Sequence, residues 1–214
     1  MSVVLVAHLI QDLAVLAPLV RHAKRCGFDD VRILAAERLV ETEVGAARLS
    51  VIADGHPVVP FANTAEALRA LNGVSGLVVF ASESRSEHHR PCAHLAAALP
   101  SRFVSATLQH GYECLGFLHN RAHDAAREDA GSNADILCAW FGSDRAVSVP
   151  PKDTGKVMTT GATLFLDPAP AAWLSAILAG TAGQDRGCDG RLLVCENLQS
   201  VRLRGAPREA FLTA

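Results

Sequence analysis

The chain has 214 residues, of which 50% are hydrophobic and 20% are charged, and its formal net charge is −2. These values exclude an intrinsically disordered chain, because disorder requires low hydrophobicity together with high net charge. They also exclude a nucleic-acid binder that acts through a broad basic field. The length exceeds the usual domain size of about 100–150 residues but is short for an enzyme of two full domains.

The sequence predicts no membrane span and no disulfide framework. The longest N-terminal apolar run, Val3–Ile10, is interrupted by His8 and is far shorter than the roughly 20 apolar residues that a spanning helix needs. Because no basic start or cleavage-site pattern is present, we expect a cytoplasmic protein. The six cysteines include no Cys-x-x-Cys pair, and most are expected to be buried reduced thiols.

Short apolar runs alternate with segments of helical periodicity along the chain. Strands are predicted at Ser2–Ala7, Val31–Ala35, Leu49–Ala53, Leu77–Ala81, Arg102–Leu108, Asp135–Trp140 and Val157–Thr160. Helices are predicted at Ile10–Cys26, from Asn63 or Thr64 to Leu71, at about His88–Leu99 and at Ala169–Leu178, with a helical or irregular stretch at Leu118–Arg127. This alternation is typical of βαβ units, so we expect an α/β, Rossmann-like three-layer sandwich with a mainly parallel sheet.

The end of the chain departs from this rhythm. Residues 1–180 suit one Rossmann-like domain, and residues 181–190 form a linker with no periodicity. Residues 191–214 open with an apolar run typical of a first strand, but they are too few to make a second domain. We therefore interpret them as a stub that resembles the start of a second Rossmann-like domain, and as a possible contact surface for another copy of the chain or a partner chain.

The sharpest candidate site follows the strand that ends at Leu108. In doubly wound sheets, ligands bind at the carboxyl ends of the strands. There, His110 is a candidate general base with Gln109 beside it, Gly111 permits a tight turn, and Glu113 would orient the histidine. The alternative is a turn glycine beside a histidine with a purely structural hydrogen bond.

Other polar residues lie after predicted strands or at a helix start. Arg90 at a helix start would grip an anionic or sugar group, and Arg85 or Arg90 would hold anionic acceptor groups. Glu83, just before them, is a further candidate for substrate binding. The remaining candidates for substrate binding are His8, Thr160, Gly161, Glu196 and Asn197. His89 and Cys92 with His119 or His123 would make a zinc site, but the spacing fits no standard zinc pattern, so no metal site is predicted. The nucleotide-binding glycine motifs are absent from the sequence, and no cofactor is predicted.

Three short motifs occur in an order that resembles a known enzyme class. They are Gln109-His110-Gly111, then Ala134-Asp135 opening an apolar strand, then Lys156-Val157-Met158-Thr159-Thr160-Gly161. This order resembles the N-terminal half of GT-B glycosyltransferases, and is most similar to bacterial surface-polysaccharide and CDP-glycerol glycerophosphotransferase-like proteins. The chain departs from that pattern where Thr159 replaces a valine and where Ala162-Thr163 replaces an Asn-Pro pair.

The resemblance implies a fold of the GT-B N-terminal-domain type and a transfer reaction. A nucleotide-activated sugar or polyol phosphate would be transferred to a glycan acceptor during surface-polysaccharide synthesis, and most of the donor-binding domain would be missing. The family histidine matches His110 and, more weakly, its glycine matches Gly111. The alternative is a non-catalytic Rossmann-like module that binds a ligand or a protein.

Overall fold

The computed structural model describes residues 1–83, 89–110, 131–145 and 149–166, which all belong to one compact unit, Met1–Ser175. Several predicted segments lie outside the described residues and stay predictions. They are the stretch Leu118–Arg127, the helix Ala169–Leu178, the linker 181–190 and the stub 191–214. Within the described part, no helix is both long enough and apolar enough to span a bilayer.

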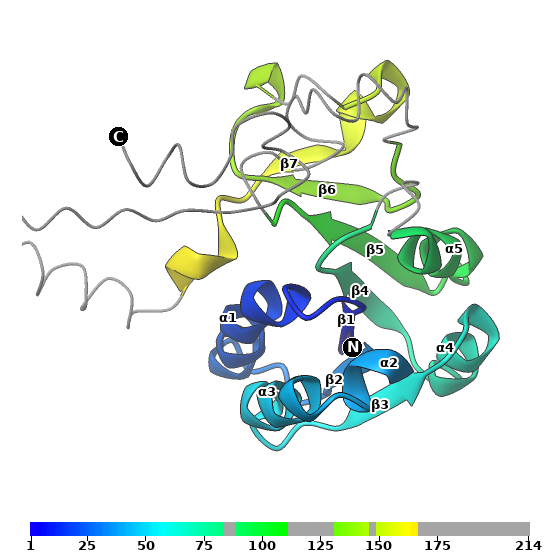
Figure 1. The fold of residues 1–214 in the computed structure, drawn as a ribbon. Helices are drawn as coiled ribbons and strands as arrows, with labels where there is room; N and C mark the ends of the chain where they lie inside the picture. The colour runs from blue at the N-terminus through cyan, green and yellow to red at the C-terminus, as the bar shows by residue number, and fades with distance from the viewer. Residues whose placement is uncertain (84–88, 111–130, 146–148, 167–214) are drawn as a thin grey trace, which may run out of the picture. The chain divides into compact units, whose positions relative to one another are not determined.

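The described strands form one sheet in which every neighbouring pair is parallel (Figure 1). The sheet has the order β3-β2-β1-β4-β5-β6-β7. The strands are β1 (Ser2–Ala7), β2 (Val31–Ala36), β3 (Val58–Phe61), β4 (Gly76–Phe80), β5 (Phe103–Leu108), β6 (Ile136–Ala139) and β7 (Val157–Thr159). The chain builds outward from β1 in one direction and then returns to its other side with β4. The topological switch therefore lies between β1 and β4.

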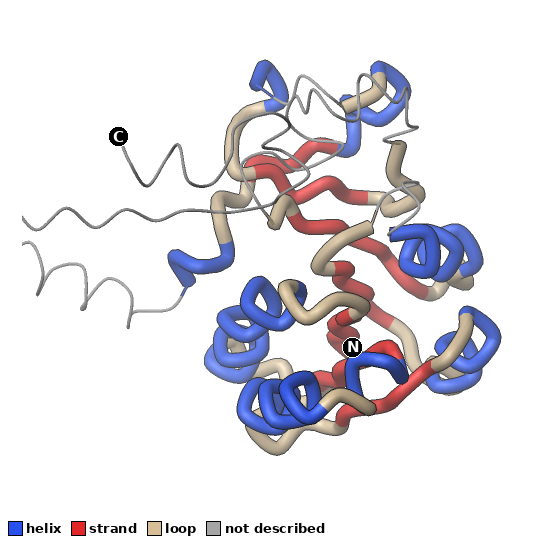
Figure 2. The backbone as a smooth tube through the Cα atoms, viewed as in Figure 1, coloured by secondary structure: helices blue, strands red, loops and turns tan. Residues whose placement is uncertain are grey.

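Helices cover both faces of this sheet (Figure 2). They are α1 (Asp12–Arg25), α2 (Glu37–Val40), α3 (Glu43–Ala53), α4 (Thr64–Ala70) and α5 (Arg90–Ala98). Short 3-10 turns lie at η2 (Ser143–Arg145), η3 (Pro151–Lys156) and η4 (Thr163–Leu166). Apart from α2 and the segment between residues 43 and 61, the helices and strands that were predicted here end within two residues of their expected bounds.

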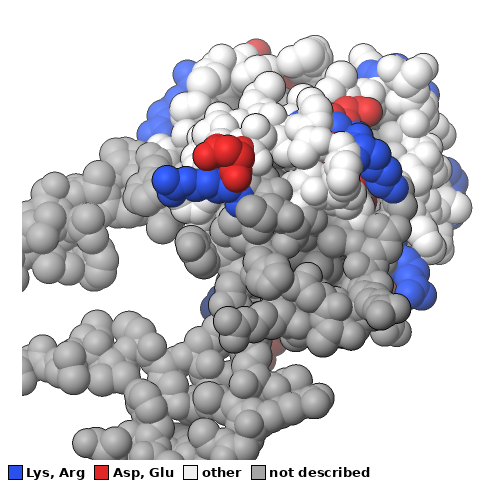
Figure 3. Space-filling view, turned by 90° about the horizontal axis from the view of Figure 1, so that it is seen from above, with Lys and Arg blue, Asp and Glu red and all other residues white. Residues whose placement is uncertain are grey.

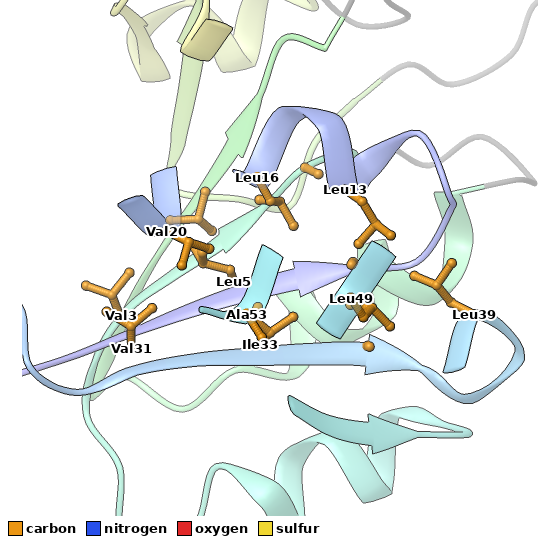
Figure 4. Close-up of a cluster of buried hydrophobic side chains, with 14 of the residues drawn as sticks. Val3, Leu5, Leu13, Leu16, Val20, Val31, Ile33, Leu39, Leu49 and Ala53 are labelled. Atoms are coloured by element: carbon orange, nitrogen blue, oxygen red, sulfur yellow. The ribbon is translucent and has the colours of Figure 1, made fainter. Parts of the chain in front are cut away.

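Each face of the sheet has its own hydrophobic core. On one face, alternate residues of β1 and β2 pack against α1, α2 and α3; the large side chains there are Leu5, Ile33, Leu13, Leu16, Leu39 and Leu49 (Figure 4). On the other face, Val4, Val6 and Leu34 pack with Phe80 and Leu95. Because both faces of β1 are covered, all of its residues are buried, which explains its continuous apolar sequence.

The strand predicted at Leu49–Ala53 is wrong, because these residues form the end of α3. The hydroxyl of Thr42 accepts a hydrogen bond from the Gly45 backbone N–H and starts the helix, and Asp54 ends it in the left-handed conformation with φ 46°. Leu49 and Ala53 are buried one helical turn apart, whereas Val51 is 81% exposed. The exposed Val51 therefore completed a run of apolar residues that has the sequence pattern of a buried strand. The third strand is β3, at Val58–Phe61.

The start of α4 was expected at Asn63 or Thr64, and the structure confirms it. The side-chain oxygen of Asn63 accepts a hydrogen bond of 3.0 Å from the Glu66 backbone N–H. The Glu66 carboxylate reaches back and accepts a hydrogen bond of 2.9 Å from the Ala62 backbone N–H. Polar side chains thus pair backbone donors at this helix start, as capping residues do elsewhere.

Gly76 pairs with Ser2 at the start of β4 and gives a first test of the fold. Its φ is +143°, and an added Cβ would lie 2.2 Å from the Ser2 carbonyl oxygen. We expect Gly76→Ala to lower the free energy of unfolding by at least about 2 kcal/mol, because the cost of backbone strain at this φ and the cost of overpacking against Ser2 are summed. Gly155→Ala is the control, because nothing lies within 4 Å of the Cβ it would add. Urea denaturation measures both variants, and equal stabilities would contradict the β1–β4 packing described here.

Candidate functional site

The carboxyl ends of β1, β4 and β5 bring three segments together around the topological switch. His8 follows β1, Ser82 and Glu83 follow β4, and Gln109 and His110 follow β5. Since α1 begins soon after β1, Asp12 also lies at this edge, where it contacts both His8 and Ser82. Polar side chains from segments far apart in the sequence therefore meet at the place where doubly wound sheets bind ligands.

Asp12 is the buried centre of this cluster. Its side chain accepts hydrogen bonds of 2.8 and 2.9 Å from the backbone N–H groups of His8 and Leu9, and one of 2.9 Å from the Ser82 hydroxyl. Asp12 is 0% exposed. Burial raises the pKa of this carboxyl, against the lowering effect of its hydrogen bonds and of the charge on His110.

His110 is partly buried and lies within the electrostatic field of Asp12. Burial lowers the pKa of the His110 imidazole, while the Asp12 charge and backbone hydrogen bonds with Leu108 and Ala81 raise it and offset part of this effect. The ring also packs edge-on against that of His89, with 5.8 Å between the ring centroids. The neutral form of an imidazole has a basic nitrogen, so His110 has the chemistry of a general base near neutral pH.

His8 contacts Asp12 through its backbone N–H and Arg38 through its ring. The Arg38 Nη2 atom lies 2.5 Å from His8 Nε2 and 3.4 Å from the His8 carbonyl oxygen. Burial, followed by the Arg38 charge, lowers the pKa of His8 to about 4. His8 is therefore neutral over the physiological pH range. Arg38 is exposed at the same edge of the sheet and comes from α2, directly after β2.

The thiol of Cys92 on α5 is buried, and the charges of Asp12, Glu83 and Arg38 influence its pKa. Burial raises the pKa of Cys92 well above its usual value, the charges of Asp12 and Glu83 raise it further, and the charge of Arg38 lowers it. A buried thiol that stays protonated is a poor nucleophile, so Cys92 serves as a packing residue.

Two predicted substrate-binding residues are engaged within the protein. Glu83 is 4% exposed; its carboxylate accepts hydrogen bonds from the Ser132 hydroxyl and, at 3.1 Å, from the Asn133 backbone N–H. Burial raises the pKa of Glu83, against these hydrogen bonds and the nearby Lys156 charge. Gln109 is 3% exposed, and its side-chain oxygen accepts a 2.8 Å hydrogen bond from the Trp140 backbone N–H. These contacts join the ends of β4, β5 and β6.

The other predicted site residues are more dispersed. Arg90 is exposed and begins α5. Thr160 and Gly161 follow the edge strand β7, and their backbone N–H groups donate to the Ala139 carbonyl at 2.9 and 3.2 Å. Predicted residues outside the described part of the chain are Arg85, Gly111, Glu113, Glu196 and Asn197, along with His119 and His123. In the described ranges, no three potential metal ligands among His, Cys, Asp and Glu come together.

The sequence reasoning missed two members of the cluster, Asp12 and Arg38. Asp12 stood in the first turn of the helix that follows the first strand, where an acidic side chain can accept hydrogen bonds from free backbone N–H groups. Arg38 stood just after the second strand. Asp54, the residue after the wrongly predicted third strand, forms an exposed ion pair with Lys24 at 3.2 Å.

Comparison with known proteins identifies a similar fold but no matching family. No protein-family model matches the chain, and no curated protein sequence matches it either. Among solved structures, the chain is similar to UDP-GlcNAc 2-epimerase from Neisseria meningitidis, bound to UDP-GlcNAc, with a TM-score of 0.54 and 13% sequence identity. The match covers 85% of this chain and 51% of that chain, so this chain spans about half of that enzyme's length.

This similarity and the sheet topology together confirm the expected fold class. The chain has a Rossmann-like α/β fold with a parallel sheet between two helical layers, similar to the fold of this epimerase. At 13% identity, the likeness concerns the fold alone.

Figure 3 shows one face of the molecule, on which acidic and basic side chains are interspersed among the described residues.

The lowered pKa of His8 makes the stability of the fold depend on pH. An unfolded histidine binds its proton near pH 6.5, whereas folded His8 binds it only near pH 4. The unfolded state therefore binds more protons in this window, and His8 lowers the free energy of unfolding as the pH falls from about 6.5 to 4. We expect the difference in stability between the wild type and His8→Gln to change across this window.

The free energy of unfolding is measured against pH for the wild type and for His8→Gln. Subtracting one curve from the other removes the contributions of Asp12, Glu83 and His110, which both proteins share. Buried carboxyls with a raised pKa act in the opposite direction, because the folded state takes up their protons first as the pH falls. Denaturant titrations at several pH values measure the difference. Parallel curves for the two proteins would contradict the burial of a neutral His8.

The field of Asp12 on His110 gives a second test of the site. We expect the His110 ring to titrate below pH 6.5, because burial disfavours the imidazolium. Asp12→Asn should lower the His110 pKa further, since it removes the charge that favours protonation. NMR titration of the histidine ring protons measures both values, with His110→Gln identifying the signal. A pKa that stays constant or rises in Asp12→Asn would contradict the coupling.

Proposed function

We propose that the chain is the His110-bearing half of a GT-B-type transferase that acts on a nucleotide-activated sugar or polyol phosphate. The observation that supports this most is a partly buried histidine with a lowered pKa at the end of β5, in the field of the buried Asp12. The similar fold of an enzyme bound to a nucleotide sugar supports the substrate class. The finer assignment, to glycerophosphotransferase-like proteins of surface-polysaccharide synthesis, rests on the three sequence motifs.

In this proposal, His110 removes the proton from an acceptor hydroxyl. The acceptor oxygen then forms a bond to the anomeric carbon of the donor sugar, while the bond from that carbon to the phosphate oxygen breaks and the nucleotide leaves. With a nucleotide-activated polyol phosphate, the same oxygen instead forms a bond to the phosphorus that carries the polyol, while the bond from that phosphorus to the bridging oxygen of the diphosphate breaks and the nucleoside monophosphate leaves. The proton ends on the His110 ring, where the negative charge of Asp12 stabilises the imidazolium.

The roles of the neighbouring residues follow from their place around His110. Asp12 supports the imidazolium electrostatically, and Glu113 remains a candidate for orienting the ring. Glu83 and Gln109 fix the ends of β4 and β5 through their hydrogen bonds to residues 132–133 and 140. Arg85, Arg90, Gly111, Thr160 and Gly161 stay candidates for contact with the acceptor or donor, as do Glu196 and Asn197.

Transfer and donor hydrolysis by the purified chain test this proposal. The donors are a panel of nucleotide sugars and CDP-glycerol, and product is measured as released nucleotide. We expect His110→Gln to reduce kcat by about 100-fold or more, because a positioned general base contributes at least that factor. His94→Gln is the matched control, since His94 is an exposed histidine on α5.

Binding separates a transferase from a non-catalytic module. A wild-type chain that releases nucleotide, with activity lost in His110→Gln and kept in His94→Gln, supports the proposal. Full activity in His110→Gln would overturn the role of His110. If thermal-shift measurements show that no donor stabilises the chain, and no donor is turned over, the module is the better description.

A further inference from the structure

Arg38 is an exposed cation at the switch edge and has no carboxylate partner among the described residues. Its only hydrogen bonds there join Nη2 to His8, at 2.5 Å to Nε2 and 3.4 Å to the carbonyl oxygen. By contrast, Arg32, Arg69 and Lys24 each form an ion pair with a nearby acidic residue. The other N–H groups of Arg38 are therefore available for an anion from solution.

The contact with Arg38 also fixes the tautomer of His8. A guanidinium can only donate hydrogen bonds, so His8 Nε2 must accept, and the proton of the neutral ring lies on Nδ1. His8 is 6% exposed, and its Nδ1 atom is buried without a hydrogen-bond partner in the described structure. Buried donors are nearly always paired, so the His8 N–H is one of the few buried polar groups in the described residues that have no partner.

We propose that Arg38, positioned by His8, binds a phosphate group of the substrate. This inference rests on the proposed function and adds the chemistry by which one part of the site recognises its ligand. A phosphate has several acceptor oxygens, which match the forked N–H groups of the exposed Arg38 guanidinium. A neutral sugar hydroxyl has neither the charge nor the number of acceptors.

The arrangement also limits how Asp12 opposes an anion. The Asp12 carboxylate faces the backbone N–H groups of His8 and Leu9 and the Ser82 hydroxyl, which spread its charge over three donors. Arg38 contacts the His8 ring at Nε2 and the His8 carbonyl oxygen, whereas Asp12 accepts a hydrogen bond from the His8 backbone N–H. The two charges therefore contact different atoms of one histidine.

Calorimetric titration with sodium pyrophosphate tests the phosphate site directly, at neutral pH and low salt. We expect Arg38→Gln to weaken pyrophosphate binding at least about tenfold, and Arg38→Lys to weaken it less, because the charge remains while the fork is lost. The matched control is Arg48→Gln, which removes an exposed arginine on α3. Equal binding by the wild type and Arg38→Gln would overturn the proposal, as would a wild type that binds no phosphate ligand.

Two His8 variants test the positioning role. His8→Gln keeps a side-chain acceptor for Arg38, so we expect its pyrophosphate affinity to stay within about threefold of the wild type. His8→Leu has no acceptor and should bind as weakly as Arg38→Gln. Circular dichroism checks that both variants are folded, and the Arg38 variants decide the question if His8→Leu is not. Wild-type affinity in a folded His8→Leu would contradict the positioning role.

Further ligands identify the source of the phosphate and separate this inference from the proposed function. If UDP or CDP binds more strongly than glycerol 3-phosphate, and this binding is lost in Arg38→Gln, the site belongs to the donor. If glycerol 3-phosphate binds more strongly and its binding is lost in Arg38→Gln, the site belongs to a phosphorylated acceptor. If pyrophosphate binds through Arg38 but no nucleotide sugar or CDP-glycerol binds, the phosphate site stands and the proposed function falls. If those donors bind equally to the wild type and Arg38→Gln, the proposed function stands and this inference falls.

Discussion

The burial of the Asp12 carboxylate is the interaction on which the candidate site depends. A carboxylate leaves water at a large cost in free energy unless hydrogen bonds replace its hydration. Here the replacements come from the backbone that joins β1 to α1 and from Ser82 after β4. Satisfying one charge therefore fixes the path of the first crossover and joins it to the strand across the switch. The orientation of His8, and through it that of Arg38, follows from that path.

Burial and nearby charges both change the pKa values of the titratable groups around the Asp12 carboxylate. Burial favours the neutral forms of Asp12, His8 and His110, whereas each close pair of opposite charges favours the ionised forms. In His110 the two effects oppose each other, which is the condition under which an imidazole can gain and lose a proton during a reaction. In His8 the nearby charge is positive and acts in the same direction as burial, so this ring stays neutral. Two histidines at one edge of the sheet thus have different chemistry because their neighbours differ.

Hydrophobic patterning predicted most of the fold and only part of the site. Runs such as Ser2–Ala7 identified buried parallel strands, and Asn63 with Glu66 identified a helix start, because burial and capping act over a few neighbouring residues. The pattern was wrong at Leu49–Ala53, where the exposed Val51 completed an apolar run on a helix. His8 and His110 were found because they follow strands directly. Asp12 and Arg38 were missed because their importance comes from Ser82 and His8, partners that only the folded chain brings close.

The order of the strands has a consequence for how the chain folds during synthesis. Ser2 at the start of β1 pairs with Gly76 at the start of β4, 74 positions later in the sequence. At ribosomal speeds of about 5–20 residues per second, β1 waits roughly 4 to 15 seconds for this neighbour to be made. During that time, an almost entirely apolar strand that belongs in the middle of the sheet has an unpaired edge. The nascent chain is thus most open to aggregation, or to capture by a chaperone, before residue 80 emerges from the ribosome.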